Sequence, residues 1–131
     1  MIAPYTTYPR TVVGIVGILY IVLGVFCSMD PVKLGDAMGY SFIGNGIIEF
    51  VVVYGGLEIG FGLAMLVATM NRILFPGVYF LTAVVSLALP IARVWMLIPR
   101  GMEGKMGTFL MIEIAILAAL IWPLFRRSRA K

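Results

Sequence analysis

Four apolar runs, each long enough to cross a lipid bilayer, follow one another along this chain of 131 residues. They cover residues 11–29, 47–70, 73–98 and 107–125. A membrane-spanning helix needs about 20 mostly apolar residues, and in lipid only helices and closed barrels satisfy their backbone hydrogen bonds. The runs take up most of the chain, and 62% of all residues are hydrophobic. We therefore predict an all-α integral membrane four-helix bundle, with residues 1–131 forming one transmembrane domain.

The first run is predicted to stay in the protein as a helix and not to be a cleaved secretory signal. No site of the A-x-A type follows it, and bulky Phe26 stands before Cys27, where a lipoprotein cleavage site would have a small residue. The three connections and two tails are too short for a separate soluble domain. Catalysis on such a domain is therefore not expected.

Basic residues predict the orientation of the bundle, because Lys and Arg near helix ends are retained in the cytoplasm. The side on which both termini lie carries more basic residues, namely Arg10, Arg72, Arg126, Arg127, Arg129 and Lys131. The opposite side carries only Lys33, Arg100 and Lys105. We therefore predict that both termini are cytoplasmic. In the first outer connection, Asp30 and Pro31 are suited to the N-cap and first position of a helix. This pair predicts a short interfacial helix ending near Met38.

Glycines mark the faces on which the first two helices are expected to pack. Gly14, Gly17 and Gly24 fall on one side of the first run, and Gly56 and Gly60 form a small-x-x-x-small motif in the second. Small residues let two helix backbones approach closely in lipid. We expect this motif to pack inside the bundle, with dimerisation as the less favoured alternative.

Arg93 and Glu113 are predicted to be partners. Arg93 lies five residues before the outer end of the third run, and Glu113 six residues after the outer start of the fourth. At a rise of 1.5 Å per residue both lie roughly 8–9 Å below that end. An unpaired charge at this depth is costly. An ion pair that holds the two helices in register is the simplest interpretation, and a ligand contact is the alternative.

Glu58 is the residue that points most directly to a function. It lies in the middle of the second run, where a carboxylate must be protonated, paired or in contact with water. Candidate partners are Arg93 and Tyr54, which is one turn away. Glu49, at the start of the same run, is expected to reach the outer interface. Glu58, Arg93, Glu113 and Tyr54 together suggest a polar pocket that opens toward the outer leaflet.

Several classes of site are excluded by residues that the sequence lacks. It contains no histidine and a single cysteine, Cys27. Zinc, haem and copper sites built from histidines or several cysteines are therefore not expected, nor is a Ser-His-Asp or Cys-His catalytic arrangement. We predict no metal site and no catalytic residue. The basic C-terminal tail is interpreted as an anchor on anionic lipid and not as a nucleic-acid site.

The chain resembles the domain-of-unknown-function 4345 family of small bacterial membrane proteins. The most specific segment is YGGLEIGFG, Tyr54 to Gly62; the family often has a basic residue shortly before it, where this chain has Val51. The other matching features are Gly24 to Pro31, Glu49, Ala92-Arg93 and Glu113. The resemblance implies a compact four-helix protein of the bacterial inner membrane, distantly similar to DoxX-like proteins. It implies no activity.

Three classes of function stay open at this stage. The favoured one is a small binding or accessory membrane protein, or a subunit of a larger complex, that holds a lipid, a quinone or another amphipathic molecule without a cofactor of its own. The second is a homo-oligomeric proton- or cation-coupled transporter in which Glu58 titrates. A membrane enzyme is the least favoured, because no recognisable catalytic motif is present.

Overall fold

The computed structural model describes residues 7–101 and 105–128, and the described chain is all helical. Its elements, in order, are α1 (Thr7–Met29), α2 (Pro31–Met38), α3 (Gly46–Phe50), η1 (Val51–Leu57), α4 (Glu58–Met70), α5 (Phe75–Arg100) and α6 (Met106–Ser128). Within the described residues, four helices are long and apolar enough to cross a membrane. The predicted all-α fold with four such helices is therefore confirmed.

The observed boundaries differ from the predicted ones mainly at the helix ends. The first helix begins at Thr7 instead of residue 11, and the last continues to Ser128 instead of ending at residue 125. In both cases polar residues at the end of an apolar run continue the helix, because helical hydrogen bonding does not require apolar side chains. The second span runs from Gly46 to Met70 and includes α3, η1 and α4 without a break.

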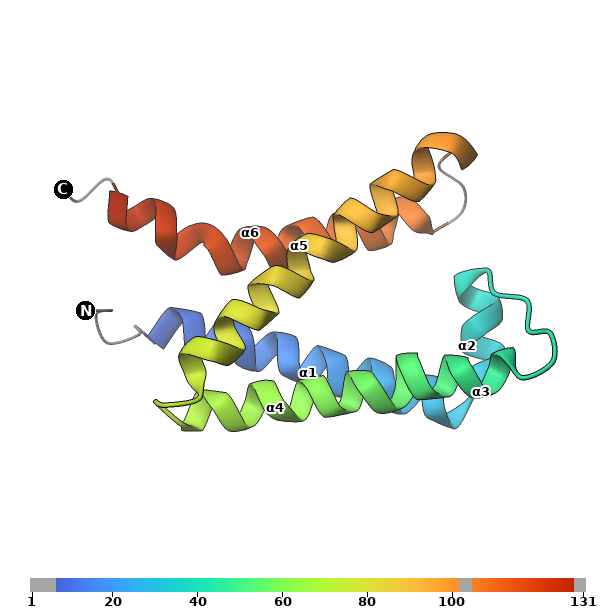
Figure 1. Cartoon of the computed structure of the whole chain (residues 1–131), viewed down its shortest axis with the longest axis horizontal. Helices are drawn as coiled ribbons and strands as arrows, with labels where there is room; N and C mark the ends of the chain where they lie inside the picture. Colours follow the sequence, from blue (N-terminus) through green and yellow to red (C-terminus); the bar gives the residue numbers. More distant parts are fainter. Residues whose placement is uncertain (1–6, 102–104, 129–131) are drawn as a thin grey trace.

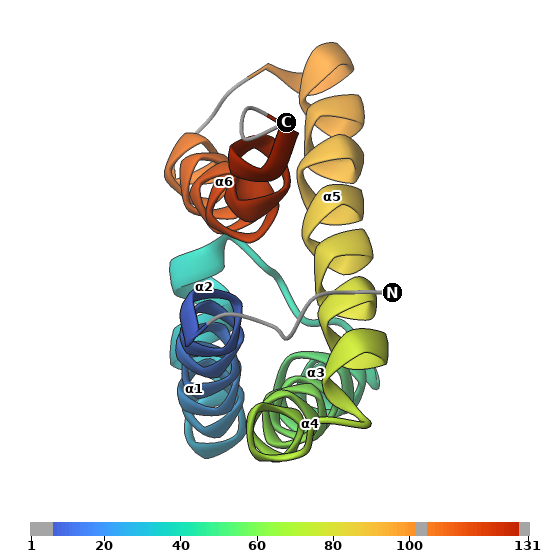
Figure 2. The same cartoon turned by 90° about the vertical axis from the view of Figure 1, so that its left-hand side faces the viewer.

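The four long helices form two antiparallel pairs (Figures 1 and 2). The second span packs along α1, and α5 packs with α6. The pairs meet where α4 turns into α5, and α5 then crosses away from α4 toward the opposite end of the molecule (Figure 1). The start of α1 and the end of α6 lie at one end of the molecule, and α2 stands at the other (Figure 1).

The hydrophobic core lies at the end where the two pairs meet. All four long helices contribute to it, through Val13, Val16, Met65, Ala68, Phe75 and Leu120, each almost fully buried. The turn before α5 is held by Asn71, whose Oδ1 accepts hydrogen bonds from the backbone N–H groups of Ile73 (2.8 Å) and Leu74 (3.3 Å). The pairs are therefore fastened at this end. Many apolar side chains elsewhere face outward, as expected for helices in contact with lipid.

Glycines allow α1 to approach the second span closely, but the glycines of the second span that make this contact are not the predicted ones. A Cβ added to Gly17 would lie 2.9 Å from the Gly62 carbonyl oxygen, and one added to Gly24 would lie 2.7 Å from that of Gly55. A Cβ at Gly56 or Gly60 would meet nothing within 4 Å. The predicted packing of the Gly56-Gly60 motif inside the bundle is therefore wrong. Gly55 and Gly62 are two helical turns apart, as are Gly17 and Gly24, so these residues face each other.

The segment η1 is a π-helix of seven residues, with sequence VVVYGGL, and the sequence analysis did not predict it. A π-helix pairs residues i and i+5 and so has a wider turn than an α-helix; such segments are frequent at functional sites. It lies between Glu49 and Glu58 and contains Tyr54. Because the turns of η1 are wider, Glu49 and Glu58 are rotated relative to each other about the helix axis by a different angle than in a regular α-helix.

The short helix predicted after Met29 is present as α2. The Asp30 side chain accepts a hydrogen bond from the Lys33 backbone N–H (3.2 Å), and Pro31 opens the first turn. The helix ends at Gly39, whose φ of 84° lies in the left-handed region that favours glycine. Gly35, on the buried side of α2, leaves room for the ring of Phe42. These contacts define both ends of α2 and pack the following loop against it.

Candidate functional site

Arg93 of α5 and Glu113 of α6 form an ion pair. Arg93 Nε lies 3.1 Å from Oε1 and 2.9 Å from Oε2 of Glu113, and Nη2 lies 2.5 Å from Oε1. The side chains are 26% and 13% exposed, so the pair is largely withdrawn from the surface but Arg93 can still be reached. The structure thus brings together the two residues that were predicted to be partners from their depth.

A pocket of about 930 Å³ lies beside this ion pair. Its walls come from α2, from the second half of α5 and from the start of α6. Most of the lining is apolar, and Arg93, Asp36 and Lys105 are the charged residues in it. The lining residues are Asp36, Ala37, Met38, Gly39, Leu89, Ala92, Arg93, Met96, Leu97, Gly101, Lys105 and Met106. The pocket is therefore a mainly apolar space with a guanidinium in its wall.

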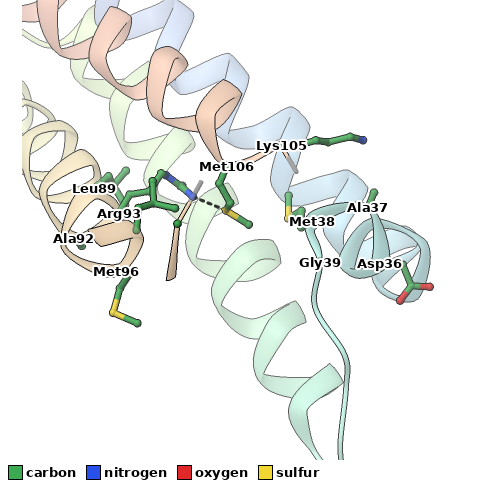
Figure 3. A pocket seen from close by; sticks show the side chains of 12 residues that line it. Asp36, Ala37, Met38, Gly39, Leu89, Ala92, Arg93, Met96, Lys105 and Met106 are labelled. Atoms are coloured by element: carbon green, nitrogen blue, oxygen red, sulfur yellow. Dashed lines mark hydrogen bonds between the residues drawn. The ribbon is translucent and has the colours of Figure 1, made fainter. Parts of the chain in front are cut away.

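Arg93 directs its remaining edge at Met106 (Figure 3). Its Nη1 donates to the thioether sulfur of Met106 at 3.4 Å. The guanidinium carbon lies 5.5 Å from the centroid of the Phe109 ring, a cation–π distance. The side chains of Lys105 and Asp36 point away from these two residues (Figure 3). Arg93 is partly buried, whereas Asp36 and Lys105 are exposed.

Tyr54 hydrogen-bonds to Tyr40, and not to Glu58. The two phenol oxygens lie 2.6 Å apart. The rings of Phe42 and Phe50 pack against them, with centroid distances of 5.0 to 6.4 Å within the group of four. We call these four residues the outer aromatic cluster. Partial burial and the hydrogen bond to Tyr54 raise the pKa of the Tyr40 phenol. The cluster fastens the loop after α2 to η1.

Glu58 lies apart from the pocket. Its Oε2 is buried and has no hydrogen-bond partner among the described residues. The groups within its electrostatic range include Tyr20 and Cys27 of α1, and Tyr20 is also within range of Glu113. Glu58 therefore lies near side chains of α1. Arg93 and Tyr54, the two predicted partners of Glu58, form their hydrogen bonds with other residues.

Of the four candidate site residues, only Arg93 lines the pocket. Glu113 pairs with Arg93, and Tyr54 belongs to the outer aromatic cluster. Glu58 is not among the lining residues, and its Oε2 has no hydrogen-bond partner in the described part of the chain. Sequence reasoning missed Met106 and Tyr40, since neither residue type is unusual near a membrane surface. It also missed the part played by α2, although the Asp30-Pro31 start of that helix was a visible signal. Glu49 is exposed near the start of the second span.

The described residues contain no group of three or more His, Cys, Asp and Glu side chains that could hold a metal ion. The pocket lining contains no acid or base paired with a nucleophile. What the arrangement offers is a hydrogen-bond donor of fixed position beside an apolar space, which suits binding. Comparisons with protein-family models, with curated proteins and with solved structures found no match.

Proposed function

We propose that this small integral membrane protein binds an amphipathic molecule, such as a lipid or a quinone, in the pocket between α2, α5 and α6. The observation that carries the proposal is the place of Arg93, a charged donor in the wall of a mainly apolar pocket. A site of this composition orients a ligand by one polar contact and holds the rest by apolar surface. No catalytic group is needed for this function.

The apolar wall of the pocket continues into the membrane-facing surface of α5. Leu89 and Met96 line the pocket, yet they are 41% and 45% exposed. With Ala92 and Arg93 they lie on one side of the helix, at spacings of three and four residues. A headgroup placed at Arg93 could therefore leave its tail among the lipid chains. A ligand of this shape would enter from the bilayer.

We also propose an accessory role, in which the protein passes its ligand to a larger membrane complex or senses the ligand for it. The mainly apolar lining of the pocket, with Arg93 as a donor, supports binding of this kind. We further propose that the pocket faces the outer leaflet of a bacterial inner membrane. The basic asymmetry of the chain and its resemblance to the 4345 family support this placement.

Native mass spectrometry from mild detergent tests the binding function. The wild-type protein should retain an amphipathic molecule, and Ala92→Trp should lose it because the indole fills the pocket. Val84→Trp is the matched control, since Val84 is exposed on the same helix and lies outside the pocket lining. Equal ligand occupancy in the two variants, or a wild-type protein that retains no ligand and binds none added, would refute the proposal.

The buried Oε2 of Glu58 favours a second function, proton- or cation-coupled transport by a homo-oligomer. A carboxylate within a membrane helix and without a partner is a common feature of ion pathways. Glu58→Gln keeps the shape of the side chain and removes its ability to carry charge. In liposomes it should abolish solute flux driven by a pH gradient. If wild-type and variant proteins give the same flux, the transport hypothesis fails.

A further inference from the structure

The donors of Arg93 are unequally satisfied. Nε and Nη2 face the carboxylate of Glu113, a strong and charged acceptor. Among the described residues, Nη1 donates only to the Met106 sulfur, at 3.4 Å. A thioether is a weak acceptor, whereas hydrogen bonds from a charged donor to oxygen are among the strongest in proteins. The Nη1 edge is therefore a donor that an oxygen atom in the pocket would satisfy better than the protein does.

The charges of the described residues at the pocket balance. Glu113 neutralises Arg93 directly. Of the other charged residues in the lining, Lys105 and Asp36 carry opposite signs, and both point away from Arg93 (Figure 3). The described residues at the site thus offer no excess positive charge. An anionic headgroup brought to Nη1 would also approach the Glu113 carboxylate and be repelled by it, in surroundings where charges are poorly screened.

We propose that the pocket selects an uncharged amphipathic molecule that presents a carbonyl oxygen to Arg93 Nη1 and displaces the Met106 thioether. This inference rests on the proposed binding function and adds the chemical class of the ligand. Glu113 is a specificity-determining residue in this scheme, because it cancels the charge of Arg93 and leaves its donor edge in place. Met106 occupies the donor until a ligand arrives.

Two kinds of membrane molecule carry this chemistry. The ester carbonyl of a diacylglycerol and the ring carbonyl of an isoprenoid quinone both provide an uncharged acceptor at the end of a long apolar chain. The pocket is proposed to recognise the carbonyl oxygen and the apolar chain that both molecules share. The experiment therefore includes both, together with phosphatidylglycerol, which has similar acyl chains and an anionic headgroup.

Binding is measured for the full-length protein in micelles of dodecyl maltoside, a detergent without a carbonyl group, with dioleoylglycerol, ubiquinone and dioleoylphosphatidylglycerol added in turn. At least one uncharged molecule should bind about tenfold or more tightly than phosphatidylglycerol, because a hydrogen bond from a charged donor contributes about one power of ten or more. Binding of only one of the two uncharged molecules identifies the source. The preference should change little with salt concentration, since no net charge is neutralised.

Two variants of Met106 test the donor directly. Met106→Gln supplies an amide oxygen to Nη1, so it should weaken binding of the uncharged molecule by about tenfold, the value of one such hydrogen bond. Met106→Leu keeps the apolar volume and removes the competing sulfur, so it should bind as tightly as the wild type or more tightly. Similar binding by the Gln and Leu variants would contradict the proposed contact.

Glu113→Gln tests the charge balance, because it keeps a hydrogen-bonding partner for Arg93 but leaves the guanidinium charge uncancelled. Its preference should move toward phosphatidylglycerol, which a purely structural role for Glu113 does not predict. If wild-type protein binds phosphatidylglycerol as well as or better than both uncharged molecules, this inference fails while the binding function stands. If it binds none of the three, the binding function fails as well.

Discussion

Arg93 holds both carboxylate oxygens of Glu113 with the Nε–Nη2 edge of its guanidinium, and so joins α5 to α6 at the end where the two helix pairs separate. A bidentate pair of this kind fixes both distance and orientation. The contact therefore positions the Nη1 edge of Arg93 at the pocket, and it also limits how far the two helices can slide along each other.

Removing one member of this pair should destabilise the protein. Arg93→Leu or Glu113→Leu is expected to cost about 2–3 kcal/mol, less than for a fully buried pair because both side chains are partly exposed. The double variant should lose less than the sum of the two single losses. Unfolding by SDS in mixed micelles measures these differences. Strictly additive losses would show that the two side chains do not stabilise each other in the membrane.

The glycine contacts between α1 and the second span predict two opposite results on one helix. Gly62→Ala should destabilise the protein by about 1–3 kcal/mol, because the added Cβ would lie 2.5 Å from the Gly17 carbonyl oxygen and force the helices apart. Gly60→Ala should leave stability unchanged or slightly raised, since nothing lies within 4 Å of its Cβ position. Thermal unfolding in one detergent compares them. Equal losses would place Gly60 in a contact that the monomer lacks.

The raised pKa of Tyr40 predicts that the folded protein loses stability at alkaline pH. Its pKa is raised in the folded protein, so the folded state holds the phenolic proton more tightly than the unfolded chain does. This contribution is complete below the unfolded pKa of about 10 and is lost as pH rises above it toward the folded pKa. Tyr40→Phe should unfold at a temperature that depends less on pH in this range. An unchanged pH dependence would assign the effect to another group.

Orientation can be measured by cysteine labelling in a Cys27→Ala background. Ser41, in the exposed loop after α2, is predicted to face outward, and Ser128, at the end of α6, to face the cytoplasm. A membrane-impermeant maleimide added to intact cells should therefore label Ser41→Cys and leave Ser128→Cys unlabelled until the cells are opened. The reverse pattern would invert the topology and turn the pocket toward the cytoplasmic leaflet.

The long helices and the ion pair could be predicted from sequence for the same reason. The thickness of the bilayer sets the length of each helix, and the constant rise per residue converts sequence position into depth. Arg93 and Glu113 were matched by depth alone, without knowledge of how the helices pack. The depth of a residue does not tell how its helix is rotated about its own axis, however, and so which neighbour its side chain meets. That Glu58 lies near Tyr20 and Cys27 of α1, and that its buried Oε2 has no hydrogen-bond partner among the described residues, required the structure.

The unknown rotation of the second helix also explains the wrong prediction for Gly56 and Gly60. The small-x-x-x-small motif identifies a face by its small residues alone. The observed contact uses Gly55 and Gly62, whose spacing of two turns matches that of Gly17 and Gly24. Comparing the spacing in both helices would have found the correct face. The π-helical segment η1 and the position of α2 at the pocket have no comparable rule, because both depend on contacts between residues distant in sequence.

The close fit of Gly17 on Gly62 and of Gly24 on Gly55 has a consequence for biogenesis. All four residues belong to the first two spans, so the main contact of this pair is complete as soon as Met70 has left the ribosome and entered the membrane. Membrane helices insert first and associate afterwards. The first helical hairpin can therefore assemble while α5 and α6 are still being synthesised, and it then provides the surface on which the second hairpin docks.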